Sequence, residues 1–171
     1  MSKANDGRWG LTRERLSQVM GYDPETGLFT RLINTANRPV GEVAGTLKSS
    51  GYILLDIDGH RYRAHRLAWL YMTGAWPSLD VDHRNRVRSD NRWDNLREAT
   101  CVQNGANSPK KRFNRSGYKG VYWNKQRGKW AAKINPNRKQ VHLGFYDRVE
   151  DAAAAYERAA PEYFGEFARA A

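Results

Sequence analysis

One short polar stretch holds the residues with the clearest chemistry, VDHRNRVRSDNRWDNLREAT at positions 81–100. Its single histidine, His83, directly follows Asp82, and Asn104 lies just beyond the stretch. A carboxylate and an amide oxygen suit a hard divalent cation, so we expect Asp82 and Asn104 to bind Mg²⁺, with Mn²⁺ as the alternative. A histidine with a pKa near neutrality suits deprotonation of the water that attacks a phosphodiester in line. These residues therefore predict metal-assisted phosphodiester hydrolysis with His83 as the general base.

The elements around these residues must bring Asp82 and Asn104 together. Asp82 and His83 fall on a short predicted strand, and their side chains point to opposite faces because side chains alternate along a strand. After the polar loop a second strand begins at Asn95, and a Thr-x-x-Gln capping box at 100–103 opens a helix. The order strand, loop, strand, helix returns the chain to its start, so we expect Asn104 to face Asp82. We expect Asn95 to pin the loop and to orient His83 by hydrogen bonding.

The segment upstream of the polar stretch is predicted to be a scaffold. We expect in turn a helix at 11–20 stopped by Gly21, a hairpin around 22–32, a strand at 52–57, a hairpin turn at Asp58 and Gly59, and a helix at 64–72 ended by Gly74. Two histidines belong to these elements. We expect His65, on a core-facing helix, to be a buried structural group, and His60, at the turn, to be exposed or to contact phosphate.

The composition points to a polyanionic partner. The 171 residues include 29 Lys and Arg against 18 Asp and Glu, which gives a formal charge of +11 and a pI near 10.0. The sequence lacks an apolar run near the ~20 residues of a membrane span and lacks a secretory leader, so we expect a soluble, cytoplasmic protein without a membrane partner. Its one cysteine, Cys101, excludes an internal disulfide, and we expect that residue to be a small buried hydrophobe.

The positive charge is concentrated in one part of the chain. Between Glu98 and Asp147 the sequence has no acidic residue. The basic residues of this interval are Lys110, Lys111, Arg112, Arg115, Lys119, Lys125, Arg127, Lys129, Lys133, Arg138 and Lys139. Tyrosines and tryptophans are interspersed with them, and this combination favours a nucleic-acid surface over a merely solvated charged face.

The last third of the chain is predicted to be a separate small domain at residues 117–171. A Gly-, Asn-, Ser- and Lys-rich segment without periodicity supplies a basic linker at 109–116, after a first module at 1–108. Three short strands and an alanine-rich helix follow, and we expect Pro161 to interrupt that helix. On the middle strand Trp130, Ala132 and Ile134 share one face, while Lys129, Ala131, Lys133 and Asn135 share the other. The predicted fold class is α+β.

The polar stretch and its continuation, VDHRNRVRSDNRWDNLREATCVQNGAN, resemble the HNH nuclease motif, which has a ββα-metal fold. The resemblance is to the variety found in phage and intron-borne homing endonucleases, in which an asparagine replaces the final histidine. The segments YDPETGLFTR and HRLAWLYMTG resemble those that precede the motif in phage HNH proteins. The resemblance implies that His83 is the general base, Asp82 and Asn104 are metal ligands, and Asn95 is the structural asparagine.

The C-terminal segment from SGYKGVYW to YFGEFA resembles the AP2/ERF DNA-binding domain over almost its whole length. This resemblance implies a three-stranded antiparallel sheet that lies in the major groove of duplex DNA, with the helix packed behind it. The residues expected at the DNA by position are Lys119, Tyr122, Asn124, Lys125, Arg127, Lys133, Asn135, Gln140 and His142. Several base-contact positions differ from plant members of the family, so the plant target sequence does not carry over.

Together these features predict a phage homing endonuclease that cleaves or nicks double-stranded DNA at a site selected by the AP2-like domain. We expect it to act as a monomer in the cytoplasm of a phage-infected bacterial cell. The alternative is a non-catalytic DNA-binding regulator with a structural HNH segment. An RNA-binding or packaging accessory protein would use the same charge without a metal site.

Overall fold

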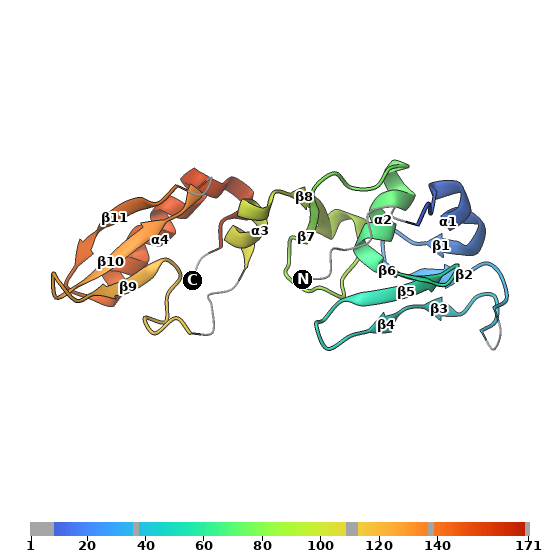
Figure 1. Ribbon diagram of the computed structural model, residues 1–171, viewed down its shortest axis with the longest axis horizontal. Coiled ribbons are helices and arrows are strands. Elements are labelled where there is room, and N and C mark those ends of the chain that lie inside the picture. Colours follow the sequence, from blue (N-terminus) through green and yellow to red (C-terminus); the bar gives the residue numbers. More distant parts are fainter. Residues whose placement is uncertain (1–8, 36–37, 109–112, 137–138, 170–171) are drawn as a thin grey trace. The chain divides into compact units, whose positions relative to one another are not determined.

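The computed structural model describes residues 9–35, 38–108, 113–136 and 139–169, and the chain divides into two compact units, 1–99 and 100–171. Figure 1 labels the helices and strands of both units. The expected end of the first module at 108 and the expected start of the second at 117 stay predictions. Residues 109–112 of the predicted linker, which include Lys110 and Lys111, lie outside the described residues. The mixture of helices with small antiparallel sheets confirms the α+β class.

The first unit opens with a short helix that runs directly into a strand. Helix α1 spans Arg13–Val19, and the Thr12 side chain caps it by accepting a hydrogen bond from the Arg15 N–H. Strand β1 (Met20–Tyr22) pairs with β2 (Phe29–Arg31), which pairs with β3 (Val43–Ala44). The prediction that Gly21 stops the helix was wrong. The helix already ends at Val19, because the chain becomes extended at Met20 and pairs with Arg31.

A second antiparallel sheet and the longest helix of the first unit follow. The sheet consists of β4 (Thr46–Leu47), β5 (Ile53–Ile57) and β6 (His60–Arg63), and α2 (Ala64–Thr73) comes next. Asp58 and Gly59 both have positive φ, 49° and 78°, as a two-residue hairpin turn requires. Gly74 ends α2 in the left-handed conformation, as predicted.

A two-stranded hairpin completes the first unit and carries the polar stretch. Strand β7 (Asp80–His83) pairs with β8 (Leu96–Ala99), and the 3-10 turn η1 (Trp93–Asn95) leads into β8. One core supports most of these elements. It is built from Leu16, Val19, Met20, Phe29, Leu55, Ile57, Tyr62, Leu67, Leu70, Val81 and Leu96, among others.

The second unit begins with α3 (Cys101–Asn107), and the predicted capping box is present. The Thr100 hydroxyl accepts a hydrogen bond from the Gln103 N–H, and the Gln103 side chain accepts one from the Thr100 N–H. The prediction that Cys101 is buried was wrong, because its thiol is exposed. Cys101 occupies the first position of α3, and the buried residues of this helix are Ala106 and Asn107 at its other end.

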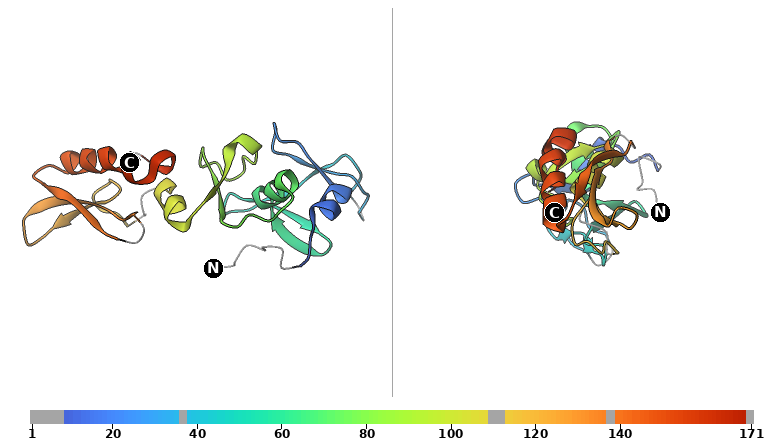
Figure 2. Two further views of the ribbon diagram at one scale, coloured as in Figure 1. Left: turned by 90° about the horizontal axis from the view of Figure 1, so that it is seen from above. Right: turned by 90° about the vertical axis from the view of Figure 1, so that its left-hand side faces the viewer.

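A three-stranded sheet covered by one helix forms the rest of the second unit. Strands β9 (Val121–Asn124), β10 (Lys129–Ile134) and β11 (Val141–Tyr146) are antiparallel, with β10 in the centre. Helix α4 (Val149–Phe164) lies along one face of the sheet, and the 3-10 turn η3 (Gly165–Phe167) follows it (Figure 2). Small side chains let helix and sheet approach closely, and those buried on α4 are Ala152, Ala153, Ala155, Ala159 and Ala160.

Two residues of this unit bear on its packing. Gly120 has φ +74°, and a Cβ there would lie 2.2 Å from the Tyr156 ring and 2.5 Å from the Lys133 carbonyl, so only glycine fits. The prediction that Pro161 interrupts the helix was wrong. Pro161 lies inside α4, one turn before its end, where its missing N–H removes a single helical hydrogen bond and its own carbonyl accepts from Gly165.

Among the described residues, no helix is long and apolar enough to cross a membrane.

Candidate functional site

His83 ends β7 in an enclosed position. Its residue exposure is 3%, and its ring lies 5.0 Å from the ring of His65 and 6.1 Å from that of Tyr52, centroid to centroid. Its Nε2 lies 3.4 Å from Oδ1 of Asn91, a long hydrogen bond. Burial lowers the pKa of His83, although the Asn91 hydrogen bond and the charges of Asp82 and Asp90 oppose that shift. The ring is therefore neutral at pH 7 and can accept a proton.

His65 is buried in α2, as predicted, and it packs against His83. Its ring meets that of His83 edge-on, at an interplanar angle of 85°, and lies 5.2 Å from Tyr52. Burial lowers the pKa of His65 well below its usual value, and His83, Arg63 and Arg66 push it the same way. A buried histidine that favours its neutral form thus forms one wall of the His83 environment.

Asp82 is paired with an arginine across the hairpin. Asp82 and Arg97 are register partners, and Oδ2 of Asp82 accepts hydrogen bonds from Arg97 Nε at 3.2 Å and Nη2 at 3.1 Å. Both side chains are buried, with 9% exposure for Asp82 and 7% for Arg97. The carboxylate therefore balances a buried guanidinium whatever else it binds.

Asn95 holds the polar loop between the two strands of the hairpin. Its Oδ1 accepts the Asn85 N–H at 2.9 Å, and its Nδ2 donates to the Asp90 carbonyl at 2.7 Å. Asp90 binds the Asn85 amide and the Arg92 guanidinium, and these contacts lower its pKa to about 2. Asn95 thus joins two points of the loop, Asn85 and Asp90, by hydrogen bonds. The Oδ1 of Asn91, in the same loop, lies 3.4 Å from Nε2 of His83, and the hydrogen bond from Asn95 to His83 stays a prediction.

Asn91 is a site residue that sequence reasoning missed. It is 1% exposed, and its carbonyl accepts a hydrogen bond of 2.7 Å from the Tyr22 hydroxyl. The turn after β1 supports the same segment, because a Cβ on Gly27 would lie 2.4 Å from the backbone of Asn91, and the Trp93 N–H donates to the Pro24 carbonyl. The signal in the sequence was the turn DPETG. Its glycine, Gly27, is needed because the backbone of Asn91 approaches it closely, and not for the turn alone.

Two arginines place positive charge beside this site. The guanidinium carbons of Arg63 and Arg88 lie 4.8 and 4.9 Å from the centroid of the Tyr52 ring, which itself neighbours His83. Arg88 also donates to the Ser50 carbonyl at 2.9 Å. A cationic surface of this kind suits a phosphate group.

The residues expected to bind a metal divide between the two units. Asp82 contributes a buried carboxylate, a hard oxygen ligand that suits Mg²⁺. Asn104 lies half-buried in α3 of the second unit, and its part in a metal site stays a prediction. Within the described ranges, no three side chains of His, Cys, Asp or Glu gather as a metal cluster. The chemistry of the donors fits a hard cation that keeps several water or phosphate ligands.

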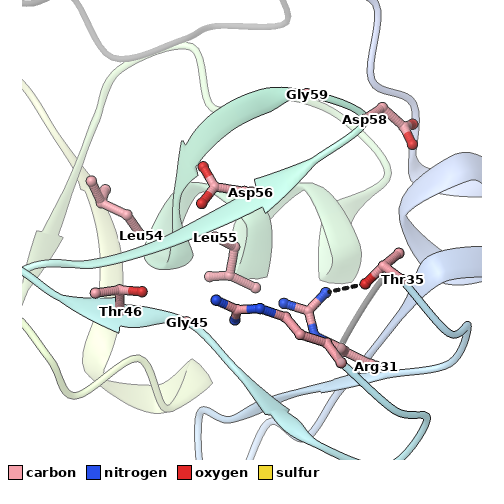
Figure 3. A pocket seen from close by; sticks show the side chains of 10 residues that line it. Arg31, Thr35, Gly45, Thr46, Leu54, Leu55, Asp56, Asp58 and Gly59 are labelled. Carbon is pink, nitrogen blue, oxygen red and sulfur yellow. Dashed lines mark hydrogen bonds between the residues drawn. The ribbon is translucent and has the colours of Figure 1, made fainter.

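A hollow in the first unit lies apart from the predicted residues. Its volume is about 560 Å³, and Arg31 reaches across it to the Thr35 hydroxyl, below the pairing of β4 with β5 (Figure 3). Its lining mixes charges of both signs, since Arg31, which pairs with Glu42, lies there together with Asp56 and Asp58, which pair with Arg61 and Arg15. This hollow is therefore not a strongly cationic site.

The outer face of the β9–β11 sheet gathers several of the residues expected at DNA. Lys133 Nζ lies 4.9 Å from the Tyr122 ring and 3.0 Å from Gln140 Oε1, and His142 is its register partner. Trp130 and Ile134 pack toward α4, which confirms the predicted division of faces. This face offers amide, imidazole, phenol and ammonium groups together.

The turn between β9 and β10 holds three more of these residues. Lys125 and Arg127 are exposed, and the Arg127 guanidinium lies 4.5 Å from the Phe145 ring. Asn124 Oδ1 accepts the Arg127 N–H and so caps the turn. Asn135 follows β10 and is exposed.

Lys119 has a different position from the other residues expected at DNA. Its ammonium donates to the carbonyls of Gly105 and Ser108, at 3.0 and 2.9 Å, and to that of Ala106. The structure therefore gives it partners at the end of α3. Charge patterning alone did not indicate this contact.

Comparison with known proteins gives one match for the HNH-like region and one for the AP2-like region. A family profile described as HNH endonuclease matches residues 62–106, and one described as AP2 domain matches residues 116–166. The chain is 32% identical over 108 residues to Protein 3.8 of Escherichia phage T7, a match that covers 63% of this chain and 88% of that protein. No solved structure matches the chain significantly.

Proposed function

Because the chain belongs to the same family as Protein 3.8 of Escherichia phage T7 and contains an HNH endonuclease region followed by an AP2 domain, we propose that it hydrolyses phosphodiester bonds in double-stranded DNA. We assign it to the phage homing type, acting in the infected bacterial cell. The single observation that carries the proposal is the enclosed His83 next to Asp82, with Arg63 and Arg88 around the neighbouring Tyr52 ring.

His83 acts as the general base in this proposal. When Asn91 Oδ1 accepts a hydrogen bond from Nε2, the neutral ring carries its basic lone pair on Nδ1, so we assign proton transfer from the attacking water to Nδ1. The packing of His65 against the ring holds its orientation. Correct placement and protonation of such a base contribute ~100 to 10,000-fold in rate.

Cationic groups around the base receive the phosphate. Arg63 and Arg88 are held in place by Tyr52, which limits the entropy lost when they bind the substrate. A divalent ion, Mg²⁺ in this proposal and Mn²⁺ as the alternative, would be held by Asp82 and Asn104 and would stabilise charge on the phosphodiester oxygens. HNH nucleases generally depend on such ions. Asn95 has the supporting role of holding the loop that carries Asn91.

The AP2-like domain selects and holds the DNA. The outer face of its sheet, with Tyr122, Lys133, Gln140 and His142, fits the major groove and offers groups that read base edges. Lys125 and Arg127, with Asn124 and Asn135 near them, are assigned to the phosphate backbone. One active site in each chain is consistent with a monomer that cuts one strand at a time.

A non-catalytic DNA-binding regulator is the second candidate. The observation that favours it is the pairing of Asp82 with Arg97, since a carboxylate that balances a buried guanidinium has a structural use without any metal. The two candidates differ in whether DNA is cut.

The test is incubation of the full chain with supercoiled plasmid and with phage genomic DNA in Mg²⁺, in Mn²⁺ and in EDTA. The proposal expects nicked or linear DNA with either ion and intact DNA in EDTA, with ends that map to a small number of sites. Binding without cutting under every condition would favour the regulator instead.

A further inference from the structure

The C-terminal end of α3 lacks a basic residue of its own. The helix has seven residues and no lysine or arginine in its last turn. The last carbonyls of any helix have no partner within that helix, and they carry a partial negative charge. A helix this short is marginal alone, so its end depends on groups from elsewhere in the fold.

Lys119 supplies the missing group. Its ammonium has three N–H donors and meets three carbonyls, those of Gly105, Ala106 and Ser108. The Ser108 hydroxyl adds a hydrogen bond to the carbonyl of Asn104. All the carbonyls from Asn104 to Ala106 therefore accept a hydrogen bond from a side chain.

Lys119 is anchored to the AP2-like fold by its neighbour in sequence. Gly120 is fixed against the Tyr156 ring of α4 and the Lys133 carbonyl of β10, where no larger residue fits. A hollow of about 360 Å³ is lined by Gly105 and Ala106 of α3 as well as by Gly120 and Tyr156. Helix α3 also contacts η3, at the end of α4. The helix is thus held on the second unit from several sides.

We propose that Lys119 is a positioning residue that fastens α3, and with it Asn104, to the AP2-like domain, so that binding of this domain to its DNA sets the position of Asn104. The inference rests on the proposed function of the HNH region. Under this proposal, binding of the target DNA and completion of the active site are coupled. It also removes Lys119 from the set of residues that contact DNA directly.

The experiment compares Lys119→Met with Lys125→Met, a matched exposed lysine assigned to phosphate. Three quantities are measured on the full chain: amide hydrogen exchange at residues 104–108 without DNA or metal, affinity for phage DNA fragments at several salt concentrations, and the single-turnover cleavage rate in Mg²⁺ at saturating DNA. Lys119→Arg serves as the conservative variant, because its guanidinium can also donate to carbonyls.

For Lys119→Met we expect faster exchange at residues 104–108, by about tenfold, and a cleavage rate lower by about tenfold, since losing a charged cap costs about one power of ten in the local equilibrium. DNA affinity stays within about twofold of wild type and the salt slope is unchanged. Lys119→Arg recovers most of the rate. Lys125→Met does the opposite, since it weakens binding and reduces the salt slope by ~1, while exchange at residues 104–108 stays as in wild type.

Two results overturn the inference. If Lys119→Met lowers affinity and the salt slope without changing exchange, Lys119 is a phosphate contact. If exchange rises but the saturating rate does not fall, the cap supports the fold without positioning the site. If the wild-type protein cuts no DNA, the proposed function fails, and the exchange measurement still decides whether Lys119 caps α3.

Discussion

The buried pair of Asp82 and Arg97 makes the effect of removing Asp82 predictable in two separate quantities. Asp82→Ala leaves the Arg97 guanidinium, 7% exposed, without its carboxylate partner. Loss of one member of a buried ion pair costs ~3 to 5 kcal/mol in the free energy of unfolding. For a unit of this size each kcal/mol shifts the melting temperature by ~4 to 8 °C, so we expect a fall of more than ~10 °C. Calorimetry of the full chain in EDTA measures this loss apart from any metal.

A second variant separates structure from catalysis at the same position. The double variant Asp82→Ala, Arg97→Met removes both charges and fills part of the space, so we expect it to regain most of the lost stability. If Asp82 also binds the catalytic ion, the double variant remains inactive in Mg²⁺ although it is folded. Recovery of cleavage to within about twofold of wild type would refute the ligand role and leave Asp82 as a partner of Arg97 alone.

Three further predictions test the surroundings of the site. Below pH ~6.5 His65 is protonated in the unfolded chain but stays neutral in the folded one, so the free energy of unfolding falls as the pH drops. In denaturant titrations at several pH values, His65→Gln should remove up to ~1.4 kcal/mol per pH unit of this slope. An unchanged slope would contradict the buried neutral state of His65. Asn91→Ala should lower the single-turnover rate by ~10 to 100-fold at unchanged DNA affinity, and a normal rate rules out its contact with His83 as an orienting one. Lys133→Ala and Gln140→Ala should change sequence preference in competition binding, whereas Lys125→Ala should weaken all sequences alike; the reverse pattern contradicts the assigned groove face.

Features set by neighbours in sequence were predicted from the sequence. The Asp58–Gly59 turn follows from the positive φ values that such a turn needs, and the capping box of α3 from two side chains three residues apart. The two faces of β10 follow from alternation, since Trp130 and Ile134 had to meet the helix. In each case the physical cause acts over a few residues.

Features set by tertiary contacts were not predicted. Asn91 reaches His83 because a turn about 65 residues earlier supports its backbone, and no local pattern encodes that approach. The pairing of Asp82 with Arg97 depends on the register of a hairpin whose long loop does not fix the register. Lys119 resembled its neighbouring lysines in sequence, and only packing of α3 on the second unit gives its ammonium three carbonyls.

We propose His83 as the base of a DNA-cleaving site, and removing its imidazole is the sharpest test of this role. His83→Ala is compared with His60→Ala. The ring of His60, in the same unit, stacks on that of Trp9 with 4.3 Å between the centroids, and His60 is assigned no catalytic role. The measurement is the single-turnover cleavage rate of phage DNA in Mg²⁺ at saturating DNA, with DNA affinity determined in EDTA. We expect a rate lower by ~100 to 10,000-fold for His83→Ala and a near wild-type rate for His60→Ala, with both affinities within about twofold of wild type. Cleavage by His83→Ala within twofold of wild type would contradict the proposed role.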